Sequence, residues 1–166
     1  MRVINTISEI LKKEGIDYLS CFPTTSIIEA AAEIGIRPII CRQERVGVGI
    51  ADGYSRITKG SPPGVFAMQY GPGAENAYPG VATAFADASP ILLLPLGHAR
   101  SRDRVFPHFS SVESFRSVTK YVEQINEVDT LGDTMRRAFQ RLKSGRPGPV
   151  MVEIPADIAE AESSEL

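Results

Sequence analysis

Apolar residues along this chain recur alternately at the spacing of helices and at the spacing of strands. The first helix is marked by Ile4, Ile7, Ile10 and Leu11, and Gly15 closes it. By the same criteria, further helices are predicted over 26–34, 44–58, 74–86 and 131–142, and strands over 18–22, 38–41, 64–69, 91–96 and 150–154. Residues 98–119 follow neither spacing and are expected to be irregular. The alternation predicts an α/β fold with a doubly wound, mostly parallel sheet of about six strands and helices on both faces.

The composition is that of an ordinary globular domain. It excludes some classes of function but indicates none. The 166 residues suit one domain, with 43% hydrophobic residues, 23% charged residues and a net charge of −2. That charge gives no general attraction to nucleic acid or to an anionic membrane, and no apolar run is long enough to span a bilayer. Cys21 and Cys41 lie in or beside apolar strands and are expected to be buried, reduced thiols. The N-terminal residues lack the pattern of a secretory leader, so the cytoplasm is the expected location.

One acidic residue stands where open α/β sheets bind their ligands. Glu44 directly follows a β-branched run and directly precedes a glycine-rich helix. A second strand, ending at Gln69, runs into a Gly-Pro-Gly turn at 71–73 that opens another helix. Ligands of such sheets bind beyond the carboxyl ends of the strands, where helix N-termini present free backbone N–H groups. We therefore predict a site in which one carboxylate lies among backbone amides.

Three segments, in this order, resemble motifs of one enzyme family. They are RQERVGVGIADGYSR at 42–56, GPGAENAYPGVATAFADASPILLLPLG at 71–97 and GRPGPVMVEIPADI at 145–158. Through them the chain is similar to the pyrimidine-binding domain of thiamine-diphosphate-dependent enzymes, in the acetolactate synthase and 2-oxo acid decarboxylase group. Three long motifs in register are far more specific than a single glycine motif. The resemblance implies a flavodoxin-like pyrimidine-binding domain over 1–157. The acidic composition of the last residues predicts a C-terminal tail over 158–166.

The resemblance assigns roles to residues at the predicted site. It implies that Glu44 is catalytic, because the family's glutamate hydrogen-bonds the pyrimidine nitrogen N1′ of the cofactor and promotes loss of the thiazolium C2 proton. From the residues alone, the alternative is a surface glutamate favoured by the helix N-terminus. Asn76 could contact the cofactor or only cap its helix. The residues expected to contact the cofactor are Pro23, Thr24, Thr25, Glu44, Gly71, Pro72 and Asn76. The two threonines replace glycines of the family.

Substrate contacts are expected in the irregular segment that begins at residue 98. His98 stands where the acetolactate synthase branch usually has glutamine, Phe109 matches its phenylalanine, and Ser110 replaces the following glutamine. A histidine can move protons near neutral pH, although a structural role is the alternative. The same segment carries three arginines that could bind a substrate carboxylate or be solvated loop charges: Arg100, Arg102 and Arg104.

The chain lacks the Gly-Asp-Gly motif with which the family holds the diphosphate and Mg²⁺. The resemblance therefore implies a partner subunit that carries this motif and holds Mg²⁺, while this chain has no metal ligands. The expected assembly is an α2β2 heterotetramer that shares thiamine diphosphate and decarboxylates or carboligates a small 2-oxo acid. Split decarboxylases of this kind are known for sulfopyruvate and phosphonopyruvate.

Glycines at 47, 49 and 53 indicate close helix packing, which we interpret as a subunit contact. The alternatives are a domain excised from a single-chain enzyme and a non-catalytic or regulatory relic.

Overall fold

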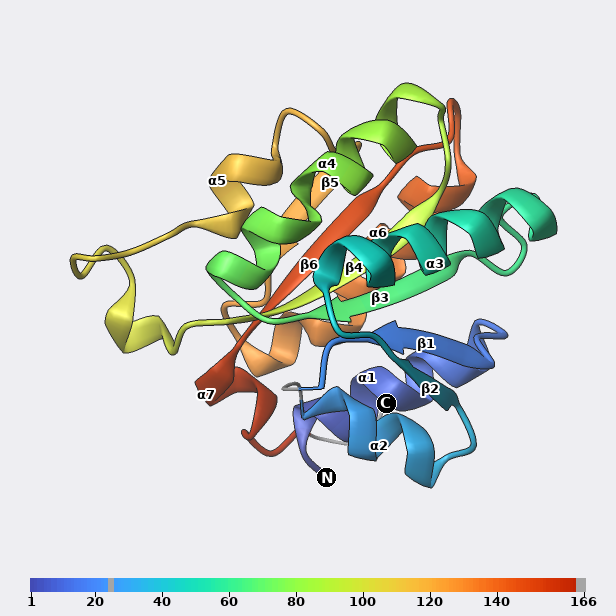
Figure 1. Cartoon of the computed structure of the whole chain (residues 1–166). Coiled ribbons are helices and arrows are strands. Elements are labelled where there is room, and N and C mark those ends of the chain that lie inside the picture. The colour runs from blue at the N-terminus through green and yellow to red at the C-terminus, as the bar shows by residue number, and fades with distance from the viewer. Residues whose placement is uncertain (24–25, 164–166) are drawn as a thin grey trace.

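A six-stranded parallel sheet forms the centre of the protein (Figure 1). The computed structural model describes residues 1–23 and 26–163. Every neighbouring pair of strands is parallel, which confirms the predicted doubly wound α/β class. In sheet order the strands are β2 (Arg37–Ile40), β1 (Tyr18–Cys21), β3 (Gly64–Met68), β4 (Ile91–Gly97), β6 (Val150–Pro155) and β5 (Tyr121–Gln124).

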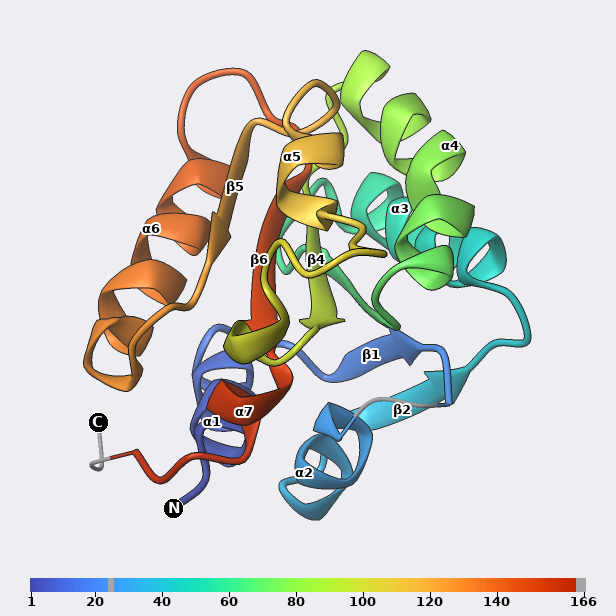
Figure 2. The same ribbon diagram turned by 90° about the vertical axis from the view of Figure 1, so that its left-hand side faces the viewer.

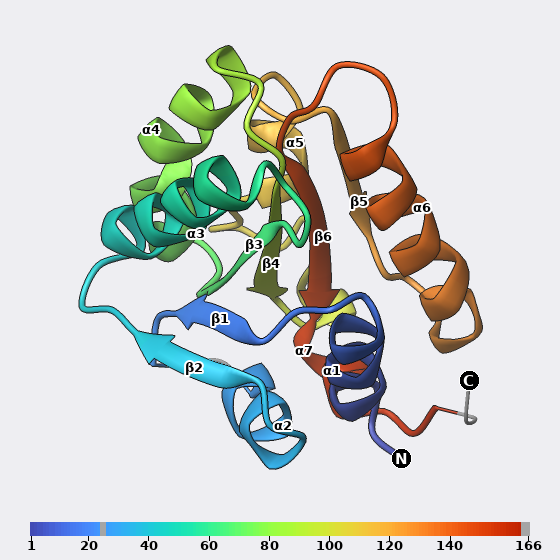
Figure 3. The ribbon, with the colours of Figure 1, turned by 90° about the vertical axis from the view of Figure 1, so that its right-hand side faces the viewer.

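Helices cover both faces of the sheet (Figures 2 and 3). One face carries α1 (Val3–Lys13), α2 (Ile27–Glu33), α6 (Leu131–Lys143) and the short α7 (Ala156–Ala159). The other face carries α3 (Glu44–Thr58), α4 (Pro72–Ala86) and the short α5 (Ser111–Phe115). Single 3₁₀ turns lie at Arg100–Arg102 and Val128–Thr130.

Each face of the sheet has its own apolar core, because successive side chains of a strand point to opposite faces. Along β3, Val65 belongs to the core on the side of α1, α2 and α6, whereas Phe66 belongs to the core on the side of α3 and α4. Cys21 belongs to the first core and Cys41 to the second, and both thiols are buried and free. The expectation that both thiols are buried is confirmed. The two sulfur atoms lie on opposite faces of the sheet.

The expected elements form at the predicted places, and three features differ from the prediction. The sixth strand, which the apolar pattern did not locate, is β5, an edge strand whose four residues are all partly exposed. The segment 98–119 is not wholly irregular, because it contains a 3₁₀ turn and α5. Ser110 starts α5, since its hydroxyl accepts a hydrogen bond of 3.2 Å from the Glu113 N–H. Helix α4 begins at Pro72 rather than at residue 74, and proline suits a first helical position.

The C-terminal segment returns to the beginning of the chain. The Ser163 N–H donates to the Met1 carbonyl at 2.8 Å, and the Ser163 hydroxyl lies 2.6 Å from that of Thr6. Ile158, the first residue of the predicted tail, is buried in the core. Residues 158–163 are therefore packed against the domain. Within the described part of the chain, no helix is both long and apolar enough to cross a membrane.

Candidate functional site

Glu44 lies just beyond the carboxyl end of β2, as the first residue of α3. Only 6% of the residue is exposed. The Nδ2 of Asn76, in the second turn of α4, donates a hydrogen bond of 2.8 Å to Oε2 of Glu44. Within the described residues, the side-chain hydrogen bond recorded for Asn76 is this one to Glu44, not a bond to the backbone at the start of α4. The side chain of Asn76 therefore orients the carboxylate, and the two predicted strand ends do converge on one site.

Two glycines bring the start of α4 against the Glu44 carboxylate. Gly71 has a φ of +58°, a conformation that favours glycine, and it turns the chain from β3 into the helix. A Cβ added to Gly73 would lie 2.8 Å from Oε1 of Glu44 and 2.9 Å from the Cβ of Gln69. The space left by Gly73 is therefore occupied by the carboxyl group. With a side chain at position 73, Glu44 would be forced out of this position.

A row of rings extends from this turn into the segment after β4. Tyr70 directly precedes the turn, and its ring centroid lies 4.2 Å from that of His98. The rings of His98 and His108 are 5.6 Å apart. Tyr70, both histidines and Phe109 line a small cavity together. The structure thus brings two predicted substrate residues, His98 and Phe109, beside the turn that adjoins Glu44.

A larger cavity, of about 360 Å³, adjoins the small one and includes the third predicted residue, Ser110. The two cavities share four lining residues: Asp103, His108, Gln124 and Glu153. Gln124 and Glu153 were missed by the sequence reasoning. Glu153 offered a signal, because it is the one acidic residue in the buried strand β6. The segment after β4, which contributes to both cavities, projects from the body of the protein on the left of Figure 1.

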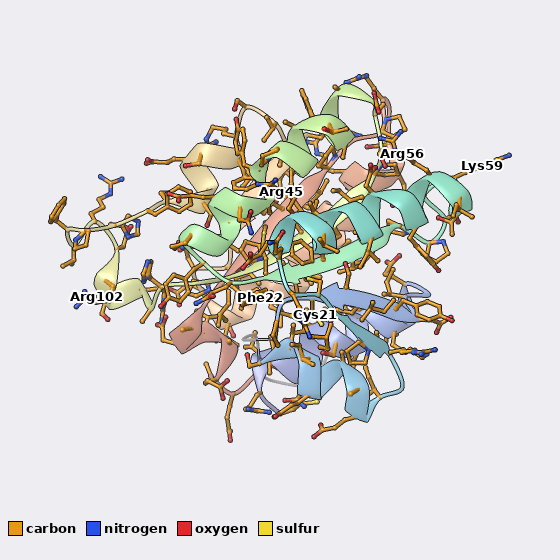
Figure 4. All side chains as sticks on the ribbon, viewed as in Figure 1. Cys21, Phe22, Arg45, Arg56, Lys59 and Arg102 are labelled. Atoms are coloured by element: carbon orange, nitrogen blue, oxygen red, sulfur yellow. The ribbon has the colours of Figure 1, made fainter. Side chains whose placement is uncertain are left out.

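Arg100, one of the predicted carboxylate-binding arginines, is held by other groups of the protein. Its Nε lies 2.8 Å from Oδ2 of Asp157, and its Nη1 donates to the Asn126 carbonyl at 2.6 Å. Burial acts to raise the pKa of Asp157, but the hydrogen bonds from Arg100 outweigh it and hold that pKa below its ordinary value. Arg102, labelled in Figure 4, is exposed on the projecting segment. Arg104 is also exposed and lines the larger cavity.

Two further predicted cofactor residues, Pro23 and Pro72, lie at the same edge of the sheet. Pro23 is exposed just beyond β1, where the neighbouring Phe22 N–H donates to the Ala67 carbonyl of β3 at 3.1 Å (Figure 4). Thr24 and Thr25 lie outside the described residues, so their contacts stay predictions. Pro72 is exposed at the first position of α4. Among residues 1–23 and 26–163, no group of three or more His, Cys, Asp or Glu side chains is arranged to hold a metal ion.

The geometry defines what the Glu44 carboxylate can do. One hydrogen bond from a neutral amide leaves the carboxylate with acceptor capacity for a ligand. Its position places it beside the N-terminal turn of α4, where backbone N–H groups lack helical partners. The carboxylate can therefore accept a hydrogen bond from a donor group of a bound ligand.

Comparison with known proteins shows the family. The chain belongs to the family described as thiamine pyrophosphate enzyme, N-terminal TPP binding domain, whose sequence pattern matches residues 1–128. The resemblance carried by the three motifs is confirmed. The fold is the one that membership implies.

Individual relatives are acetolactate synthases. The chain is 30% identical over 168 residues to the probable acetolactate synthase large subunit of Methanocaldococcus jannaschii. It is 31% identical over 158 residues to the acetolactate synthase large subunit of Haemophilus influenzae, and 34% identical over 161 residues to acetolactate synthase 2, chloroplastic, of Nicotiana tabacum. These matches cover 98%, 91% and 93% of this chain, but only 28%, 27% and 24% of the relatives. The chain thus spans about a quarter of their length.

Proposed function

We propose that this domain binds the pyrimidine ring of thiamine diphosphate in an enzyme that acts on a 2-oxo acid, with Glu44 as the catalytic residue. The observation that carries the proposal is the buried Glu44 carboxyl group, held by Asn76 at the start of two helices. A carboxyl group held in this way can bond to N1′ and share its proton. The cofactor, when bound, supplies a carbon nucleophile for the substrate carbonyl. The likeness to acetolactate synthases supports a reaction of this kind, decarboxylation or carboligation of a 2-oxo acid or both.

The residues around Glu44 fit the proposed ring. Gly73 leaves a space that a Cβ would fill, and the carboxylate occupies it. The backbone at 71–73 can approach the ring closely, since Gly71 and Gly73 carry no side chain. Pro23, with the two threonines that follow, is proposed to cover the cofactor from β1. His98, Phe109 and Ser110 are proposed to face the substrate, in keeping with their place at the two cavities.

We further propose that a partner subunit with a Gly-Asp-Gly motif holds the diphosphate and Mg²⁺, in an α2β2 assembly. Two large apolar residues on α3 are exposed, Val46 to 51% and Ile57 to 85%. A Cβ added to Gly49 or Gly53 would meet no atom within 4 Å among the described residues. An apolar, glycine-marked helix face of this kind suits contact with another helix. The face supports a subunit contact along α3.

Reconstitution tests the proposal. The isolated chain, supplied with thiamine diphosphate and Mg²⁺, should turn over no 2-oxo acid, and adding the Gly-Asp-Gly partner should produce turnover. Turnover by the purified chain alone would contradict the need for a partner. A folded complex that binds the cofactor but remains inactive would favour the relic. A Gly-Asp-Gly segment within the same polypeptide would favour the excised-domain alternative, which the one-quarter coverage of the relatives also supports.

A further inference from the structure

Glu153 is a second buried carboxylate at the carboxyl edge of the sheet, and the proposed function does not use it. It lies in β6 and is 6% exposed. Its Oε1 accepts a hydrogen bond of 2.5 Å from Nε2 of Gln124, and its Oε2 accepts one from the Ser111 hydroxyl. A Cβ added to Gly97 would lie 3.0 to 3.1 Å from the end of the Glu153 side chain. The construction repeats that of Glu44: a buried carboxylate, an amide donor and a glycine that leaves room.

The negative charge of Glu153 is not neutralised by a cation. Among residues 1–23 and 26–163, none of the ion pairs within 4.0 Å includes it. A glutamine would fill the same space and keep both contacts, because the Ser111 hydroxyl can accept as well as donate. Burying an unpaired charge costs free energy that an amide would not. The carboxylate therefore makes the fold less stable than a glutamine would. Groups that reduce stability in this way are typical of functional sites.

The surroundings of Glu153 connect it to the proposed substrate side of the site. Glu153 lines both the small cavity, beside Tyr70 and His98, and the cavity of about 360 Å³. Two arginines that line the larger cavity, Arg104 and Arg116, are exposed, so water screens their charges. Three further acids line it: Asp103, Glu113 and Glu123. The buried charge on the cavity wall is negative.

We infer that Glu153 determines substrate specificity through its charge, so that the cavity accepts a 2-oxo acid whose distal end is neutral and rejects a second acidic group. The inference rests on the proposed function. The two hydrogen bonds leave acceptor lone pairs on Glu153, so a distal hydroxyl group is favoured. A second carboxylate, sulfonate or phosphonate would meet a like charge in a poorly solvated place, where the repulsion amounts to a loss of affinity of about tenfold to a hundredfold. Sulfopyruvate and phosphonopyruvate are thereby disfavoured.

Binding without turnover tests this inference. The complex with the diphosphate-binding partner, thiamine diphosphate and Mg²⁺ is prepared in a Glu44→Gln background, and ligands are titrated by calorimetry. The ligands are 2-oxohexanoate, 5-hydroxy-2-oxopentanoate and 2-oxoglutarate, which match in length and differ in their distal group. With Glu153 present, the hydroxy acid should bind best and 2-oxoglutarate should bind at least about tenfold more weakly than 2-oxohexanoate. Glu153→Gln should reduce this difference to about threefold or less, because it removes the charge and keeps the shape.

Glu113→Gln is the matched control, because it removes the same charge from an exposed residue of the same cavity. Glu113→Gln should change the ratio of the affinities for 2-oxohexanoate and 2-oxoglutarate by less than about twofold, since water screens that charge. Strong binding of 2-oxoglutarate with Glu153 present, a ratio unchanged by Glu153→Gln, or no binding of any of the three acids would each overturn the inference. Failure of the proposed function is seen separately, as absence of C2 proton exchange on the cofactor in the wild-type complex.

Discussion

The Glu44 carboxylate is held by a side chain that sequence reasoning did not pair with it. Glu44 and Asn76 lie 32 positions apart and on different helices. Each residue alone has an ordinary local explanation, because an acid is common at a helix start and an asparagine is common near one. Only the parallel sheet places the starts of α3 and α4 next to each other, so the hydrogen bond appears in the structure alone. The proposed catalytic role of Glu44 therefore depends on Asn76, which holds the carboxylate in place.

Removal of the Asn76 side chain should weaken the activation of the cofactor by Glu44. In the assembled complex, Asn76→Ala is expected to slow C2 proton–deuterium exchange on the bound cofactor by about tenfold, because Glu44 loses a hydrogen bond that fixes its orientation. NMR of the cofactor measures the exchange. Glu75→Ala, a change at the exposed neighbour of Asn76, is the control and should exchange at the wild-type rate. Equal rates in both variants would show that Asn76 does not position the carboxylate.

The two thiols provide a test of the fold at the residue scale. Burial, with a smaller contribution from Cys41, raises the pKa of the Cys21 thiol to about 11. At pH 8 little thiolate is present, so iodoacetamide should label Cys21 only slowly until the chain is unfolded. Mass spectrometry of labelled protein measures this. Since the two sulfur atoms lie on opposite faces of the sheet, mild oxidation should leave them unlinked. A Cys21–Cys41 disulfide in the folded chain would contradict the strand register.

At the scale of elements, α3 carries glycines on two different faces. A Cβ at Gly47 would clash with the Phe66 ring and with Sγ of Cys41, so Gly47 packs α3 onto its own sheet. The interpretation of all three glycines as a subunit contact is wrong for this residue. Gly49 and Gly53 have open space instead. Sequence periodicity found the helix, but the neighbours of each glycine depend on the sheet beneath it.

A pair of matched substitutions separates the two faces of α3. Gly49→Leu should leave the thermal midpoint of the isolated chain nearly unchanged and prevent assembly with the partner. Gly47→Leu should destabilise the isolated chain itself, by about 1–3 kcal/mol or more, because it overpacks the core. Circular dichroism measures the thermal stability of the isolated chain, and light scattering measures assembly with the partner. An intact complex carrying Gly49→Leu would place the subunit contact elsewhere, and a stable Gly47→Leu chain would contradict the packing described for Phe66.

At the scale of the whole molecule, the fold class and the place of Glu44 could be predicted, because both depend on local periodicity and on strand–helix order. Strand β5 could not, since a short, partly exposed edge strand has no apolar alternation. The contacts of Glu153 with Gln124 and Ser111 depend on the meeting of β6, β5 and α5, which no local pattern encodes. The three motifs identified the family, while the arrangement of the two cavities required the structure.

The central claim is that Glu44 activates thiamine diphosphate bound between this domain and a diphosphate-binding partner. C2 proton–deuterium exchange on the cofactor in the assembled complex tests it most directly, because it reports activation before any substrate binds. Glu44→Gln keeps the shape of the side chain but cannot share a proton with N1′, so exchange should slow by about two orders of magnitude or more. Glu75→Gln, on the exposed side of α4, should exchange normally. Wild-type exchange rates in a folded, assembled Glu44→Gln complex would contradict the claim.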